Sequence, residues 1–150
     1  AGLMNDIQNL VAEFSINTDK IIIEILETGK YKDEEHVIET IHRLKTMGIK
    51  IAIDDFGAGN SNCGHLMLMQ VDYIKVDGQF VKDIVKDEQS QNITKTINAF
   101  AHMTGAKCIA EFVADKEIFE CIKKMGVDYA QGYFISQPRP ACEIEEMLKL

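Results

Sequence analysis

Charged side chains interrupt four otherwise apolar segments of this 150-residue chain. Each one lies in or at the end of a segment that reads as a β-strand. They are Glu24, Asp54, Asp55, Lys75, Asp77 and Glu111. A carboxylate buried without a partner costs several kcal/mol, so unrelated accidents of this kind should be rare. We therefore interpret these residues as parts of one site.

Strand and helix periodicities alternate along the chain. They predict strands over 21–26, 49–54, 73–77, 107–111 and 128–133. They predict helices over 3–14, 33–47, 61–69, 91–104, 115–125 and 141–149, a helical turn over 79–86, and a loop over 86–90. Five strand–helix units imply parallel strands, because parallel neighbours need crossover connections. The strands are nearly continuous apolar runs, which favours a sheet covered on both faces.

The pattern leaves two α/β architectures open, a doubly wound sheet and part of a (β/α) barrel. Chemistry at the carboxyl ends of several strands favours the barrel. No linker or low-complexity stretch divides the chain, so residues 1–150 are expected to form one domain.

Composition narrows the classes of function. A formal charge of −8 argues against a general binder of nucleic-acid polymers or anionic membranes, but not against a small phosphorylated substrate held through a cation. We expect no membrane segment, because no apolar run approaches the ~20 residues that span a bilayer, and no signal peptide. Four cysteines without a CxxC pair are typical of a reducing, cytoplasmic setting.

The carboxylates suggest a cation site. Asp54 and Asp55 could merely form a turn and cap a helix. With Glu24 on the preceding strand, however, neighbouring carboxylates repel each other and need a proton or a cation. A divalent metal bound through oxygens is the economical solution, and Glu111 could be either a third ligand or an ordinary solvated strand end.

Lys75 and Asp77 lie two residues apart on one strand, so they face the same way. They could form a structural ion pair. Alternatively, Lys75 could hold a water, a hydroxide or a developing negative charge. Gln131 adds a neutral polar group on the last strand and is weak evidence by itself.

In their order and spacing, these segments resemble the later motifs of the EAL domain family, from about Leu3 to Leu150. The matching segments are Ile23-Glu24-Ile25-Leu26-Glu27, Asp54-Asp55-Phe56-Gly57-Ala58-Gly59, Ile74-Lys75-Val76-Asp77, Ala110-Glu111 and Gln131-Gly132-Tyr133 with Pro138. The resemblance implies a cyclic di-GMP phosphodiesterase on a modified TIM-type barrel. This chain would then be a partial (β/α) barrel of about five parallel units with an extra N-terminal helix.

The resemblance also implies residue roles. Glu24 and Asp54 would bind one Mg²⁺ or Mn²⁺ ion, and Asp54, Asp55 and Glu111 would surround a second, Glu111 being counted with the catalytic residues. Lys75 would orient the attacking water. Glu27 would match a glutamate that steadies the loop after the two aspartates. Asp77 and Gln131 would match residues that line the mouth of the site. Two metals of this kind activate water and neutralise charge while a phosphodiester bond breaks.

The chain departs from the family pattern in several places. It contains no Glu-Ala-Leu motif and no metal-binding asparagine before helix 3–14, so roughly 100 residues of the usual ~250-residue barrel are expected to be missing. Phe112 and Ala114 replace a glycine and a glutamate, and Asn60 and Asn62 replace the usual tyrosine and serine. We expect the chain alone to bind metal weakly and to hydrolyse little or nothing.

The predicted edge strands, 21–26 and 128–133, would lack their barrel neighbours, and unpaired edges promote association. A second copy of the chain or a missing N-terminal segment should therefore pair with them. Three hypotheses of function follow. They are part of a cyclic di-GMP phosphodiesterase, a degenerate module that binds cyclic di-GMP or a protein partner, and a structural domain whose acidic residues form only salt bridges.

Overall fold

The computed structural model describes residues 2–27, 34–58 and 63–149. Its centre is a parallel five-stranded sheet in the order β1-β2-β3-β4-β5. The strands are β1 (Ile22–Leu26), β2 (Lys50–Phe56), β3 (Tyr73–Val76), β4 (Lys107–Ala110) and β5 (Tyr129–Ala130). Strand order therefore follows chain order, as in part of a (β/α) barrel, which confirms the predicted fold class.

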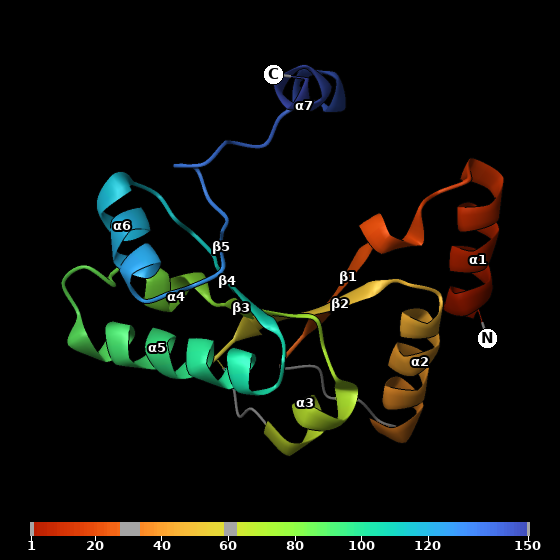
Figure 1. Ribbon diagram of the computed structural model, residues 1–150, viewed down its shortest axis with the longest axis horizontal. Coiled ribbons are helices and arrows are strands. Elements are labelled where there is room, and N and C mark those ends of the chain that lie inside the picture. The colour runs from red at the N-terminus through yellow and green to blue at the C-terminus, as the bar shows by residue number, and fades with distance from the viewer. Residues whose placement is uncertain (1, 28–33, 59–62, 150) are drawn as a thin grey trace.

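The helices connect and flank these strands. They are α1 (Gly2–Phe14), a 3₁₀ helix η1 (Thr18–Lys20), α2 (Glu34–Thr46), α3 (Cys63–Met69), α4 (Gly78–Val81), α5 (Glu88–Met103), α6 (Lys116–Lys124) and α7 (Ala141–Leu148). Helices α2, α3 and α5 lie along one side of the sheet, and α7 stands apart from it (Figure 1). None of the helices in the described ranges is long and apolar enough to cross a bilayer.

The hydrophobic core lies between the sheet and the helices on its outer side. Its buried residues include Ile41, Leu44, Ile51, Ile53, Ile74, Val76, Cys108, Ala110, Ile118 and Ile122. The other face of the sheet is more open, with Ile22, Leu26 and Tyr129 exposed. The prediction that both faces are covered holds for the central strands β2 and β3, where consecutive residues are buried, but not for the edge strands β1 and β5.

The largest difference from the predicted boundaries is in α4, which ends at Val81 rather than at 86. Local hydrogen bonds account for two smaller differences. Helix α5 begins at Glu88 rather than 91, because the Asp87 side chain caps it by accepting hydrogen bonds from the N–H groups of Gln89 and Ser90. Strand β5 is only two residues long, because Gln131 and the residues after it turn to pair with the segment around Val113.

Two aspartates fix the amino-terminal ends of neighbouring strands in the same way. Asp72 Oδ2 accepts a hydrogen bond from Ile51 N over 3.0 Å, and Asp128 Oδ2 accepts one from Cys108 N over 2.9 Å. Asp72 lies between α3 and β3 and bonds to β2. Asp128 lies between α6 and β5 and bonds to β4. Each one thus holds two parallel strands in register at the end of the sheet opposite the acidic side chains.

Candidate metal centre

Lys75 lies at the centre of the acidic residues. Its ammonium Nζ lies 2.9 Å from Glu24 Oε1, 2.7 Å from Asp54 Oδ1 and 2.8 Å from Glu111 Oε1, while only 4% of its side chain is exposed. Burial alone would lower the pKa of Lys75, but hydrogen bonds to Asp54, Glu111 and Glu24 together raise it above its ordinary value. Lys75 therefore remains a cation bound by side chains from three other strands or strand ends.

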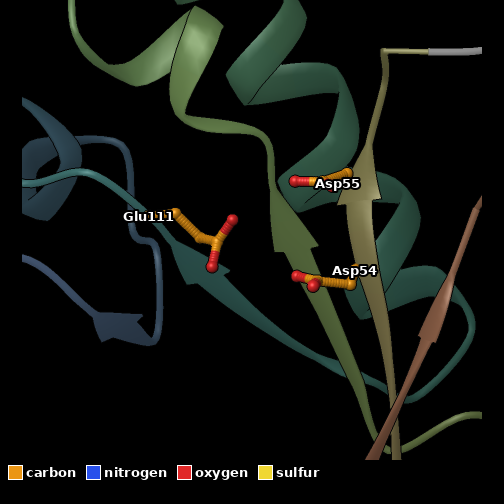
Figure 2. Close-up of side chains that lie close together, drawn as sticks. All are labelled: Asp54, Asp55 and Glu111. Atoms are coloured by element: carbon orange, nitrogen blue, oxygen red, sulfur yellow. The ribbon is translucent and has the colours of Figure 1, made fainter.

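A β-bulge brings the two adjacent aspartates to the same face. Between Ile53 and Phe56, strand β2 contains one residue more than the facing stretch of β3, and Asp55 has a φ of +55°. Consecutive residues of a regular strand would point to opposite faces. Here, instead, one carboxylate oxygen from each of Asp54, Asp55 and Glu111 lies within 4.8 Å of the others. Figure 2 shows the three side chains pointing toward one another across β3.

Burial and neighbouring negative charges raise the pKa of two of these carboxylates, Asp55 and Glu111. Burial, and then the negative charges of Asp54 and Asp77, raise the pKa of Asp55. Burial is also the main reason that the pKa of Glu111 is raised, although Lys75 opposes the shift. Like charges held this closely are stabilised by a proton or a bound cation. The cluster therefore favours binding of positive charge.

The donor set fits a hard divalent cation. Three carboxylate groups supply only oxygen ligands, which suit Mg²⁺ and Mn²⁺ better than metals that prefer sulfur or imidazole. Glu24 is linked to the three carboxylates by Lys75, whose ammonium group contacts both Glu24 and Asp54. The structure thus brings together Asp54, Asp55 and Glu111, the residues that the resemblance associated with the second metal, with Glu24 beside them.

The remaining predicted site residues have distinct contacts. Glu27 Oε2 accepts a hydrogen bond of 2.8 Å from Gly57 N, in the loop that follows the two aspartates. Asp77 caps helix α4 by accepting a hydrogen bond of 2.7 Å from the backbone N–H of Gln79. Gln131 accepts a backbone hydrogen bond from Val113. Asn60 and Asn62, the two loop departures noted in the sequence, lie outside the described residues.

A cavity of about 620 Å³ opens beside the carboxylates. It is lined by Asp55, Asp77, Gly78, Gln79, Lys82, Glu111, Phe112, Ala114, Gln131, Gly132 and Tyr133. Sequence reasoning did not find Gln79 and Lys82, since polar residues on a short predicted helical turn carry no distinctive signal. Phe112 was visible as a departure from the family pattern, and Tyr133 as part of a motif.

The chain is similar to known proteins over most of its length. The family model of the EAL domain matches residues 1–138. The chain is 34% identical to the cyclic di-GMP phosphodiesterase PdeB of Shewanella oneidensis over 139 residues, which are 93% of this chain but only 16% of that protein.

Solved structures give the same result. The c-di-GMP complex of the PaMucR phosphodiesterase superposes with a TM-score of 0.90 at 27% identity, covering 96% of this chain and 58% of that one. A manganese/cy-diGMP complex of Klebsiella pneumoniae BlrP1 gives a TM-score of 0.79 at 28% identity, covering 87% and 33%. Since the family model matches most of its length, the chain belongs to the EAL domain family.

Proposed function

We propose that residues 1–150 are part of an EAL domain that, in the whole protein, hydrolyses one phosphodiester bond of cyclic di-GMP to give the linear dinucleotide. The observation that supports this most is the set of three carboxylates within 4.8 Å of one another beside a buried lysine. The names of the relatives support the same substrate, since PdeB is a cyclic di-GMP phosphodiesterase and PaMucR was solved with c-di-GMP.

In this proposal Asp54, Asp55 and Glu111 hold a divalent cation, Mg²⁺ or Mn²⁺, and Glu24 with Asp54 contributes to a second. When bound, such ions lower the pKa of a water molecule and neutralise charge on the phosphate. The manganese complex of BlrP1 supports the choice of ion.

Lys75 orients the attacking water in this proposal. It is held by three carboxylates at 2.7 to 2.9 Å and is therefore an ammonium group, which donates hydrogen bonds but cannot accept a proton. Lys75 therefore cannot take the proton that the water releases, and Glu111 is the acceptor that we propose. Glu27 keeps the loop after Asp55 in place through Gly57, and Gln131 lines the cavity that receives the substrate.

Turnover of cyclic di-GMP with Mg²⁺ or Mn²⁺ tests the proposal. We expect turnover in the whole protein and much slower turnover by residues 1–150 alone. Lys75→Ala and Glu111→Ala should each reduce kcat by about a hundredfold or more, the usual effect of removing a group that stabilises the transition state. Lys95→Ala, an exposed lysine on α5, is the matched control and should retain activity. Unchanged turnover in both site variants would refute the assigned roles.

A receptor is the second candidate. Phe112 places an exposed ring in the cavity, and Ala114 stands where the family has a glutamate. Both changes suit a module that binds cyclic di-GMP without cleaving it. The same experiment separates the two functions, because a receptor binds the dinucleotide with no product formed in the presence of either metal.

We also propose that the outer edges of β1 and β5, the first and last strands of the described sheet, pair with a preceding part of the barrel or with a second copy of the chain. Light scattering tests whether a second copy pairs with these edges, because it measures the solution mass of residues 1–150. The cytoplasm is the compartment that we propose, since Cys108, Cys121 and Cys142 are free thiols.

A further inference from the structure

Phe112 combines three unusual properties. It is a large apolar side chain that is 64% exposed. Its φ of +57° lies in the left-handed region, which bulky residues rarely adopt. It also directly follows Glu111, one of the three clustered carboxylates, and lines the same cavity. Residues with strained backbone conformations cluster at active sites and ligand-binding sites.

Gly78 makes room for this ring. A Cβ atom added to Gly78 would lie 2.8 Å from Cβ of Phe112 and 3.2 Å from its Cγ. Any side chain at position 78 would therefore compete with Phe112 for the same space. The glycine at the start of α4 and the left-handed turn at 112 together hold an apolar ring at the wall of a cavity whose lining also includes Asp55 and Glu111.

We infer that Phe112 is a stacking surface for a purine base of a dinucleotide whose phosphate binds near Asp55 and Glu111. This inference rests on the proposed function and adds a residue that determines substrate affinity. An aromatic face stacks on any nucleobase, and a base is joined to its phosphate through a single sugar. The ring and the carboxylate belong to consecutive residues, so one nucleotide can contact both. Tyr133, 69% exposed, offers a second aromatic side chain on the same cavity.

Tryptophan fluorescence provides a direct test, because the chain contains no tryptophan. Phe112→Trp places a unique fluorophore at the proposed stacking position of residues 1–150. Phe14→Trp is the matched control, since Phe14 is 63% exposed on α1 and is not part of the cavity lining. With Mg²⁺ present, cyclic di-GMP should quench the emission of Phe112→Trp and leave that of Phe14→Trp unchanged. Equal quenching of both, or of neither, would overturn the inference.

Affinity measurements complete the test. Phe112→Ala should raise the Kd of cyclic di-GMP by about fivefold to a hundredfold, the range found when a stacked aromatic is removed. In the whole protein it should raise KM more than it lowers kcat. Gly78→Ala should weaken binding in the same direction. Unchanged or tighter binding by Phe112→Ala would show that the ring does not stack, or that it obstructs the cavity.

These outcomes separate the inference from the proposed function. Selective quenching without metal-dependent turnover would refute the phosphodiesterase proposal and support the stacking role. Turnover that depends on Lys75, together with an unchanged Kd in Phe112→Ala, would support the phosphodiesterase and overturn the stacking role. If the protein neither binds nor cleaves the dinucleotide, both fail.

Discussion

Glu27 holds the backbone of Gly57, with 2.8 Å between Oε2 of the glutamate and N of the glycine. Gly57 has a φ of +102°, and a Cβ there would lie 3.0 Å from side-chain atoms of both Phe80 and Ile97. The turn after the bulge in β2 is thus held by a carboxylate on one side and packed against two side chains on the other. The position of Asp55 therefore depends on a residue that is not in the carboxylate cluster.

Replacing Glu27 should weaken metal binding and lower the free energy of unfolding. Glu27→Ala leaves the N–H of Gly57 without this acceptor, and hydrogen bonds to charged groups contribute about 1.5–3 kcal/mol. We expect the Kd for Mn²⁺ to rise about tenfold by calorimetry, whereas Glu27→Gln, which keeps an acceptor oxygen, should show a smaller change. Glu39→Ala, on the exposed side of α2, is the control. Equal affinities in Glu27→Ala and wild type would contradict this role.

Replacing Lys75 should make stability depend on divalent cations. Lys75→Met removes the ammonium that contacts Glu24, Asp54 and Glu111, and breaking a buried ion pair costs about 3–5 kcal/mol. Urea unfolding in EDTA should show most of this loss, and Mg²⁺ or Mn²⁺ should recover part of it by neutralising the carboxylates. Lys95→Met should behave like wild type in both solutions. A loss that is the same with and without metal would argue against a cation site here.

Much of the fold could be predicted from the sequence, because periodicity distinguishes strands from helices and parallel strands place their carboxyl ends at one edge. That rule alone predicted that Glu24, Asp54 and Glu111 would come together. The bulge could not be predicted, since Asp54 and Asp55 read as alternating residues of a regular strand. Asp adopts a positive φ more often than most residues, but this preference does not identify which aspartate does so, and only the structure shows how both side chains reach one face.

The contacts of Asp77 were equally hidden in the sequence. Two residues after Lys75, it reads as a partner of the lysine on the same face. In the structure its side chain instead caps α4, because the strand has ended and the nearest unpaired donors are the first N–H groups of the helix. Asp77 still lines the cavity, so it lies at the predicted mouth while serving a structural role.

Gly132 should not tolerate even a methyl group. A Cβ there would lie 2.4 Å from both N and O of Val113, and a clash with backbone cannot be relieved by a rotamer change. Gly132→Ala should break the hydrogen bonds that join Val113 to Gln131 and Phe134, lowering the free energy of unfolding by about 2 kcal/mol or more.

Gly105→Ala is the control for Gly132→Ala. Gly105 has a φ of +80° with no atom within 4 Å of an added Cβ, so this variant measures backbone strain alone. Urea unfolding should show a smaller loss, about 1 kcal/mol. If the two variants lose the same stability, the contact between the added Cβ at position 132 and the Val113 backbone has no cost beyond backbone strain.

Asp128 should make the protein less stable in acid. Burial acts to raise its pKa, but hydrogen bonds from Cys108, Lys107 and His102 together lower it to about 2, from an ordinary value of 3.8. A lowered pKa in the folded state contributes stability above pH 4 that is lost as the pH falls toward 2. Asp128→Asn should be less stable than wild type at pH 6 and lose most of this difference by pH 2, as measured by urea unfolding. A difference that stays constant over this range would contradict the assignment.

Relieving the strain at Phe112 should stabilise the fold while weakening nucleotide binding. Asn tolerates a positive φ better than Phe, and a left-handed conformation costs an ordinary residue about 1–2 kcal/mol. Because the Phe112 side chain is 64% exposed, Phe112→Asn forfeits little buried area, and we expect the free energy of unfolding to rise by about 0.5–1 kcal/mol. Phe14→Asn, in the helical backbone of α1, relieves no strain and should not stabilise the chain. A lower melting temperature for Phe112→Asn would show that packing against Gly78 outweighs the strain of the turn.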